Sequence, residues 1–416
     1  MVLTLPSPFE ALDAAFAPYP TPFMVLDLGR VRANAERIEA AFRPLRPRLY
    51  YSIKANGDLR LLASLHEMGW GFDVASLGEM RWLQDLGVGS WMVNFSATVK
   101  VPQHIEEAHA LGVRLFGFDS AEELRKLALL APGCRGVLRL EVSQTGSRWP
   151  LGGKFGVPVG EAVPLLERAA ELGVEPYGLA FHVGSQCVRT ESWPAALVEA
   201  RRVWDEAAAR GIELKLLNLG GGFPAPYTDD VPSVAQIGNE VCRHARRLFP
   251  PDVGYALEPG RFMVAEAGVV ATTVIGKALR KGRPWVFVDL SVYSGLFEVL
   301  AGWSYPIVTA RDDRPKRTAT LAGPSCDSTD ILAREVELPD LEVGDRLLLL
   351  SAGAYTTAYR QYNGFSFPEV LVVDSAGVAT GGPEARVGRA TDGATPEDGG
   401  RQGAARGKGR GPRLMP

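Results

Sequence analysis

Lys54 ends an apolar stretch of sequence, RLYYSIKAN at residues 48–56. The residues before it are the aromatic and branched types that suit a buried strand. Lysine is depleted in strands and is almost never fully buried without a partner, so an amine at this place calls for a chemical reason. A lysine amine in a protein site can form a Schiff base with a carbonyl compound. Lys54 is therefore the first candidate catalytic residue.

Two glycine-rich turns have the composition of an anion site. The segment LNLGGGFP at residues 217–224 holds three consecutive glycines, which let backbone N–H groups approach an anion closely. The segment EPGR at residues 258–261 adds Arg261 as a countercharge. Neither segment matches the Walker loop or the GxGxxG fingerprint. Together they predict that the ligand carries a phosphate.

A lysine, a phosphate site, a carboxylate and a histidine are the groups that bound pyridoxal phosphate requires. Its aldehyde takes a lysine amine, and its ring nitrogen needs a partner. His182 would stack on the ring, although this residue taken alone would be interpreted as a hydrogen-bonded core histidine. The other histidines show no metal-ligand spacing, so no metal site is predicted: His66, His104, His109 and His244.

Eight short apolar runs between residues 45 and 262 would position these groups. The stretches between the runs have a 3.6-residue apolar period, often with Ser or Asp at the start and Gly at the end. Eight strand–helix units favour a closed (β/α)₈ barrel of the TIM type over an open doubly wound sheet. The predicted strands are 48–55, 71–76, 91–96, 115–120, 136–142, 176–184, 214–221 and 254–260.

Polar residues fall at or near the ends of these runs. In a TIM-type barrel the active site lies at the C-terminal ends of the strands, so the end residues should converge on one mouth. A single lysine after a strand would more often be a solvated loop residue, but eight polar ends in register argue against that interpretation. The residues are Lys54, Asp73, Ser96, Asp119, Arg139, His182, the glycines 220–222, and Glu258 with Arg261.

The composition changes on both sides of the predicted barrel, which we place at residues 26–265. Short β-rich segments separated by Gly, Pro and Asp predict a mostly-β domain at 266–380. Residues 1–25 show no strong repeat and are expected to pack with that domain. Residues 381–416 hold almost no large apolar side chains, which predicts a disordered tail.

Charge and cysteine content exclude several classes of protein. The chain has 416 residues and a formal net charge of −3, which gives no electrostatic reason to expect nucleic acid or an anionic membrane as a partner. Its four cysteines are far apart and form no CxxC pair, so no disulfide framework is predicted. The N-terminus lacks the basic segment of a signal peptide, and no apolar run approaches the roughly 18 residues of a membrane span. We expect a cytoplasmic protein.

Seven stretches give the chain a family resemblance. It resembles the fold-type III pyridoxal-phosphate decarboxylases, which act on ornithine, diaminopimelate or arginine and share the barrel of alanine racemase. The ornithine branch is nearest, because CDSTD is more similar to its Cys-Asp motif than to the Cys-Glu motif of the diaminopimelate enzymes. In chain order the stretches are YYSIKAN, GFDVASLGEM, FHVGSQ, LNLGGGFP, EPGR, AGPSCDSTDIL and GAYTTAYRQYNGF.

The resemblance implies roles around the cofactor. Lys54 would carry the Schiff base, His182 would stack on the ring, and Glu258 would bind the ring nitrogen. Asp73 and Glu79 would position the lysine and the groups on the ring face. Arg139 would also face the cofactor, and the phosphate would be held by Ser185, Gly221, Gly222, Gly260, Arg261 and Tyr355.

The resemblance also implies a homodimer with shared active sites. Cys326 and Asp327 would enter from the other subunit, with Cys326 protonating the carbanion and Asp327 binding the distal end of the substrate. Tyr305 and Tyr355 would contact the substrate as well. Lys154 and Asp330 would pair across the interface.

The substrate is the point at which the chain departs from ornithine decarboxylases, which usually provide a second acid before the Cys-Asp motif. The matching turn here, AGWSYP, has none. L-Ornithine or L-lysine is still favoured, bound by Asp327 alone or with Glu298 or the face of Trp303. The alternative is a different tail, as in diaminopimelate or in a citrate-conjugated diamino acid of siderophore assembly.

Two rival functions share the fold. Racemases of this family place an arginine at the ring nitrogen, so Glu258 argues against a racemase. A non-catalytic regulatory relative would lose residues of the lysine, phosphate or Cys-Asp motifs, and all of these are present. We therefore predict a decarboxylase.

Overall fold

The computed structural model describes residues 15–357, 361–362, 365–366 and 368–374. The described residues all belong to one compact unit. The predicted disordered tail at 381–416 and the first 14 residues of the predicted N-terminal segment lie outside the described residues. The domain boundaries set at residues 25 and 265 stay a prediction.

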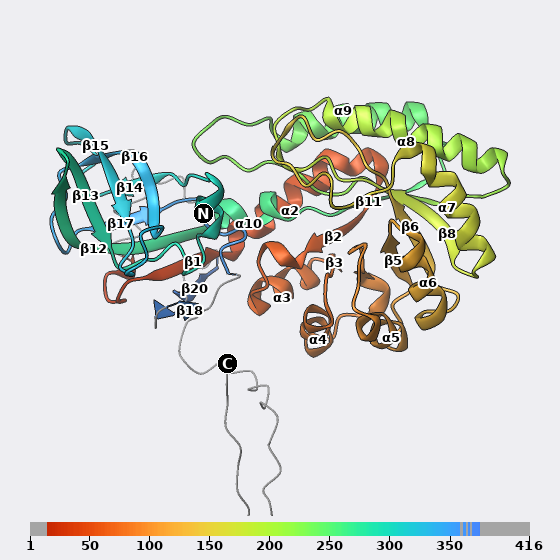
Figure 1. Ribbon diagram of the computed structural model, residues 1–416, viewed down its shortest axis with the longest axis horizontal. Coiled ribbons are helices and arrows are strands. Elements are labelled where there is room, and N and C mark those ends of the chain that lie inside the picture. Colours follow the sequence, from red (N-terminus) through yellow and green to blue (C-terminus); the bar gives the residue numbers. More distant parts are fainter. Residues whose placement is uncertain (1–14, 358–360, 363–364, 367, 375–416) are drawn as a thin grey trace, which may run out of the picture. The chain divides into compact units, whose positions relative to one another are not determined.

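Eight parallel strands form the barrel, in the order β4-β3-β2-β11-β10-β8-β6-β5 (Figure 1). A parallel bridge between Phe95 and Phe116 joins the two ends of this order, with Phe95 N donating to Leu115 O at 3.1 Å. The closed barrel is thereby confirmed over an open sheet, and every predicted run contains a strand. The strands are β2 Arg48–Ser52, β3 Gly71–Asp73, β4 Val93–Asn94, β5 Leu115–Phe118, β6 Arg135–Arg139, β8 Glu175–Ala180, β10 Leu216–Asn218 and β11 Gly254–Leu257.

Helices connect the strands and begin at residues that the sequence marks as caps. Asp58 accepts a hydrogen bond from Arg60 N at the start of α3, and Ser76 and Ser120 cap α4 and α6 in the same way. Ser233 forms a capping box with Gln236 at the start of α9. The helices are α2 Leu28–Phe42, α3 Leu59–Glu67, α4 Leu77–Asp85, α5 Pro102–Ala110, α6 Ala121–Leu130, α7 Val159–Glu171, α8 Ser192–Ala209, α9 Val234–Leu248 and α10 Arg261–Val264.

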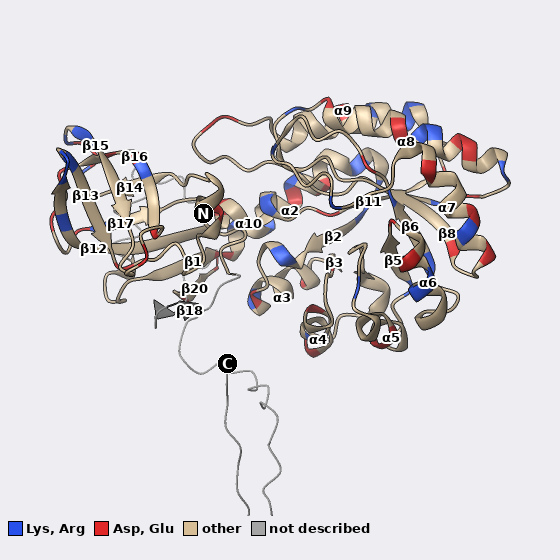
Figure 2. Cartoon of the chain, viewed as in Figure 1, with Lys and Arg blue, Asp and Glu red and all other residues tan. Residues whose placement is uncertain are grey.

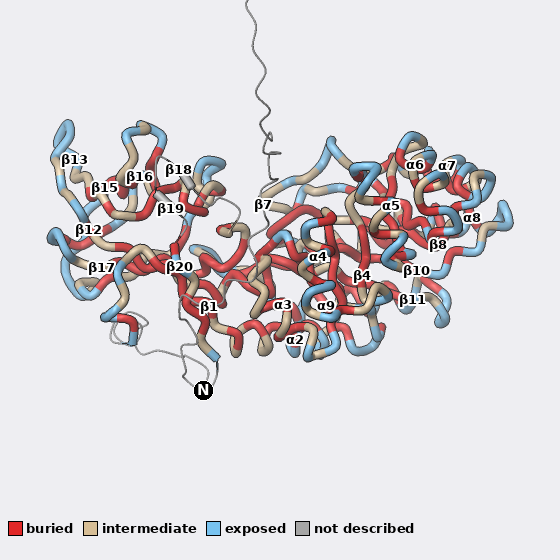
Figure 3. Tube along the Cα trace, turned by 90° about the horizontal axis from the view of Figure 1, so that it is seen from below, coloured by how far each residue is buried: buried red, intermediate tan, exposed pale blue. Residues whose placement is uncertain are grey.

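The main core lies between the helices and the barrel strands. Buried segments run along the strands and the inner sides of the helices (Figure 3). Lys, Arg, Asp and Glu are interspersed along the outer helices α7, α8 and α9 (Figure 2). Of the helices in the described part of the chain, none combines the length and apolarity needed to span a bilayer.

A second, eight-stranded sheet forms the predicted β domain. Its order is β14-β17-β12-β13-β15-β16, and β1 pairs with both β12 and β20. The strands are β1 Phe23–Asp27, β12 Gly268–Arg280, β13 Arg283–Val288, β14 Ile307–Thr309, β15 Lys316–Ala322, β16 Ile331–Pro339, β17 Arg346–Leu349 and β20 Glu369–Val373. Two small pairs complete the strands: β7 Ser147–Trp149 with β9 Ser185–Cys187, and β18 Gln361–Tyr362 with β19 Phe365–Ser366.

Candidate active site

Lys54 lies in a 3₁₀ turn, Ile53–Ala55, directly after β2. Its amine is 3.7 Å from Oδ2 of Asp73 at the end of β3. Asp73 is buried and is fixed by hydrogen bonds from Ser52 Oγ at 2.9 Å and from the backbone N of Ser96 at 3.4 Å. Desolvation at the barrel mouth disfavours the charge of the half-exposed Lys54 amine, but Asp73, Tyr355 and Glu258 outweigh this and raise the pKa of Lys54. The strand therefore ends in an ammonium because the ammonium pairs with the buried carboxylate of Asp73 at the barrel mouth.

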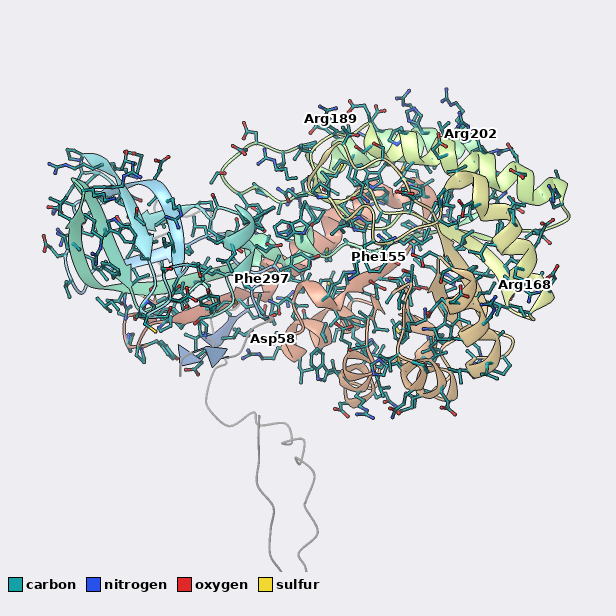
Figure 4. All side chains as sticks on the ribbon, in the orientation of Figure 1. Asp58, Phe155, Arg168, Arg189, Arg202 and Phe297 are labelled. Atoms are coloured by element: carbon teal, nitrogen blue, oxygen red, sulfur yellow. The ribbon has the colours of Figure 1, made fainter. Side chains whose placement is uncertain are left out.

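His182 and Arg139 face this pair from β8 and β6. Gly184 N donates to Nδ1 of His182 at 2.9 Å. Burial, together with the charges of Arg139 and Lys54, holds the pKa of His182 well below its usual value. The ring is therefore neutral, and since Nδ1 accepts, its proton sits on Nε2. Arg139 lies over the ring of Phe155, with its guanidinium carbon 5.3 Å from the ring centre (Phe155 is labelled in Figure 4).

Glu258, which follows β11, is held through one carboxylate oxygen. Oε1 accepts hydrogen bonds from Asn94 Nδ2 at 2.6 Å and from Asn218 Nδ2 at 2.5 Å. Burial and the nearby Asp73 raise the pKa of Glu258 to about 7. Among the described residues, no group donates a hydrogen bond to Oε2. That oxygen is left for a ligand.

The two glycine turns, here called the cradle, pack closely against neighbouring backbone at the barrel mouth. A Cβ on Gly221 would lie 2.4 Å from the carbonyl oxygen of Glu258 and 3.5 Å from His182 Nε2. Gly222 has a φ of +92°, which L-residues rarely adopt. A Cβ on Gly260 would lie 3.4 Å from the hydroxyl of Tyr355. Gly221 and Gly222 therefore permit close contacts with neighbouring backbone that a side chain would block.

Arg261 closes the cradle, but it is already paired. Its guanidinium forms a fork with Glu298, at 2.9 and 2.7 Å, and also donates to Ser185 Oγ at 3.2 Å and to Tyr227 Oη at 3.0 Å. These bonds use four of the five N–H groups of an arginine. One N–H is left for a phosphate. A phosphate bound here would therefore depend largely on backbone N–H groups of the glycine turn.

Two aromatic rings pack against the guanidinium of Arg261. Its guanidinium carbon lies 4.3 Å from the Trp303 ring and 4.7 Å from the Tyr355 ring. Glu298 is buried in the turn Phe297–Ala301. The prediction that Glu298 or Trp303 grips the substrate's distal end finds no support here, because both are engaged with Arg261.

Two other predicted acids stabilise turns. Oδ2 of Asp119 accepts from Gly156 N at 2.8 Å, and Oε2 of Glu79 accepts from Ala75 N at 2.6 Å. Burial raises the pKa of Glu79. Asp119 also contributes to the electrostatic environment of Arg139. Both therefore support the site from the edge of the mouth.

The Cys-Asp motif lies in the loop between β15 and β16. Cys326 is exposed. Asp327 accepts hydrogen bonds from Tyr293 Oη at 3.0 Å and from Thr329 N at 2.8 Å. Asp330 is buried and accepts from Ser291 Oγ at 2.9 Å. Entry of this motif into a partner's site, and a pairing of Asp330 with Lys154, stay predictions.

Tyr305 is buried in the β domain beside Tyr227, with 5.9 Å between the ring centres. Its hydroxyl and the indole N–H of Trp303 are both buried and have no hydrogen-bond partner in the described part of the chain. Two neutral donors therefore lie close to Arg261 without an acceptor.

Four residues of the site were missed by sequence reasoning. Asn94 and Asn218 lie within the predicted runs 91–96 and 214–221 and end the observed strands β4 and β10, as Asp73 ends β3 within the run 71–76. Ser52 precedes Lys54 by two positions. Tyr227 carries no such signal, because it lies in a loop whose fold places it on Arg261.

The donor set fits pyridoxal phosphate. A lysine amine, a glycine cradle with an arginine, a carboxylate with one unengaged oxygen and a neutral histidine converge on the barrel mouth. Each matches one part of the cofactor: the aldehyde, the phosphate, the ring nitrogen and the ring face.

Residues 28–265 match the family described as pyridoxal-dependent decarboxylase, pyridoxal binding domain. The chain belongs to this decarboxylase family. It is 35% identical to the lysine/ornithine decarboxylase of Selenomonas ruminantium, over 85% of this chain and 90% of that protein. The solved lysine decarboxylase from Selenomonas ruminantium superposes with a TM-score of 0.81 at 34% identity, covering 87% of this chain and 94% of that chain.

Antizyme inhibitor 2 of Xenopus laevis is also similar, at 34% identity over 82% of this chain and 79% of that protein. This pyridoxal-dependent decarboxylase nevertheless keeps every predicted motif of the lysine, phosphate and Cys-Asp sites. It is an amino-acid decarboxylase that uses pyridoxal phosphate, and its substrate class is the basic amino acids.

Proposed function

We propose that this decarboxylase releases carbon dioxide from L-lysine or L-ornithine, as a homodimer in which Asp327 of one subunit binds the distal ammonium of a substrate in the other. The observation that carries the proposal is the fixed carboxylate of Asp327, directly after Cys326. Its oxygens are oriented by Tyr293 and Thr329 in an exposed loop. An ammonium that leaves water needs an anionic partner, and this one is already in place.

The chain's own residues would hold the cofactor. Bound pyridoxal phosphate supplies an electron sink for the pair of electrons left when carbon dioxide departs. Lys54 would bind it covalently, and the glycine turn with Ser185 and the remaining N–H of Arg261 would bind its phosphate. Oε2 of Glu258 would face the ring nitrogen, and neutral His182 would pack on the ring without adding charge.

Cys326 would return the proton. The carbon that loses its carboxylate needs a proton on the same carbon, and a thiol positioned beside it can donate one. Cys326 is exposed in the loop that also holds Asp327. One loop of the partner would thus bind the far end of the substrate and protonate the near end.

A second candidate substrate is a diamino acid whose tail carries a carboxylate, such as diaminopimelate or a citrate conjugate. The specific observation is the pair of donors without an acceptor, Trp303 Nε1 and Tyr305 Oη, close to Arg261. Buried donors require acceptors, and a substrate carboxylate would supply one. An ammonium would not.

Steady-state kinetics distinguish lysine or ornithine from a diamino acid with a carboxylate-bearing tail as the substrate. We expect kcat/KM for lysine or ornithine to lead a panel with arginine, meso-diaminopimelate and an N-acylated ornithine. Asp327→Ala should lower that value at least about tenfold, or about 1.4 kcal/mol. The exposed Asp252 is the matched control, and Asp252→Ala should leave kcat/KM unchanged. Turnover of only the carboxylate-bearing substrates by cofactor-loaded protein would favour the second candidate.

A further inference from the structure

Two asparagines from different strands converge on one oxygen of Glu258. Asn94 ends β4 and Asn218 ends β10, and three strands separate them in the barrel order. Both are 2% exposed. Their amides donate to Oε1 of Glu258 at 2.6 and 2.5 Å, and this leaves Oε2 unbonded within the described residues. Both donors therefore act on the same oxygen of the partly buried carboxylate.

The orientation of Asn218 follows from its other hydrogen bond. Its Oδ1 accepts from the backbone N of Gly220 at 2.9 Å, so its NH₂ group must point to Glu258. The backbone N of Glu258 donates in turn to Gly220 O at 2.8 Å. The turn that builds the phosphate cradle thus also fixes the donor that holds the carboxylate.

We propose that Asn94 and Asn218 are positioning residues that hold Oε1 of Glu258 and so present Oε2, as an anion, to the ring nitrogen of pyridoxal phosphate. This rests on the proposed role of Glu258. An anionic Oε2 keeps the ring nitrogen protonated, and a protonated ring withdraws electrons more strongly.

The charges around Glu258 explain why two amides are needed. Burial and Asp73 favour its neutral form, while Lys54, Asn218 and Arg139 favour the anion, and together they place its pKa at about 7. Tyr50 and neutral His182 also lie nearby. Because the hydrogen bonds to Oε1 favour the anionic carboxylate, loss of one donor should favour its protonated form.

Binding of two cofactor forms tests the proposal directly. The full-length protein, stripped of cofactor, is titrated with pyridoxal phosphate and with its 1-deaza analogue, in which CH replaces the ring nitrogen. Quenching of tryptophan fluorescence gives each Kd. Wild type should prefer pyridoxal phosphate, and Asn94→Ala and Asn218→Ala should each reduce the preference about tenfold, as expected for a lost hydrogen bond to a charged group. Asn94→Asp, which keeps the side-chain size, should reduce it as well.

A matched control separates positioning from folding. Asn34 is fully buried and donates to the carbonyl oxygens of Phe262 and Met263, away from Glu258. Asn34→Ala should leave the preference unchanged, whatever it does to thermal stability. If Glu258→Gln keeps the preference, the proposed role of Glu258 fails. If Glu258→Gln abolishes it while the Asn94 and Asn218 variants keep it, the asparagines are not positioning residues.

Discussion

Removing one partner of the buried pair Arg261–Glu298 should lower the free energy of unfolding by a large amount. Both residues are 4% exposed, and the carboxylate forms two hydrogen bonds with the guanidinium. Glu298→Ala would leave a buried, unneutralised guanidinium, which typically costs about 3–5 kcal/mol. Arg261 would keep its contacts with Tyr227 and the Trp303 ring, which partly stabilise its charge. We therefore expect Glu298→Ala to lower the free energy of unfolding by about 3 kcal/mol, the low end of that range.

Urea unfolding of the cofactor-free protein at pH 7 measures this loss. The control is Glu199→Ala, which breaks an exposed pair with Arg202 at 3.2 Å, where the two side chains are 37% and 68% exposed. Exposed pairs of this kind contribute roughly 0.2–1 kcal/mol, so the control should barely move the urea midpoint.

A double variant distinguishes charge pairing from cofactor binding. Glu298→Leu combined with Arg261→Met removes both charges, and such apolar replacements of buried pairs are often neutral or stabilising. We expect most of the stability to return while affinity for pyridoxal phosphate falls. The reasoning is refuted if Glu298→Ala costs under about 1 kcal/mol, or if the double variant is no more stable than the single one.

Three further predictions concern pH, the cradle and the dimer. Because the pKa of Glu258 rises from 4.5 to about 7 on folding, its contribution to stability is present below pH 4.5 and is lost as the pH rises through 7. Between these pH values the urea midpoint of cofactor-free wild type should fall relative to that of Glu258→Gln. A difference between the two midpoints that does not change with pH would contradict the shift. Gly221→Ala should abolish retention of cofactor on dialysis, whereas Gly160→Ala, whose Cβ meets nothing within 4 Å, should retain it. Mixing inactive Lys54→Ala with inactive Cys326→Ala subunits should restore about a quarter of wild-type activity through heterodimers with one intact site, and no recovery after proven subunit exchange would count against shared sites.

The barrel and the polar residues at its mouth were predictable because their signals are local. A polar residue at the end of an apolar run marks both the strand and the mouth, and this identified Lys54, Asp73, His182 and Glu258. The same rule applied to Asn94 and Asn218 would have found the donors to Glu258.

The pairings were not predictable, because they join residues far apart in sequence. Glu298 carries no local mark that directs it to Arg261, and the sequence left it as a candidate for the substrate's distal end. Trp303 is likewise an unremarkable aromatic residue until the fold lays it on the guanidinium. Only three-dimensional packing assigns such partners.

Borohydride reduction of the protein isolated with its cofactor tests the central claim most directly, since it fixes the phosphopyridoxyl group on the amine that carries it. Peptide mapping by mass spectrometry should then find that group on Lys54, within the stretch RLYYSIKAN, and Lys54→Ala should yield no labelled peptide. A label on another lysine, such as the buried Lys100, or a label that persists in Lys54→Ala, would contradict the account.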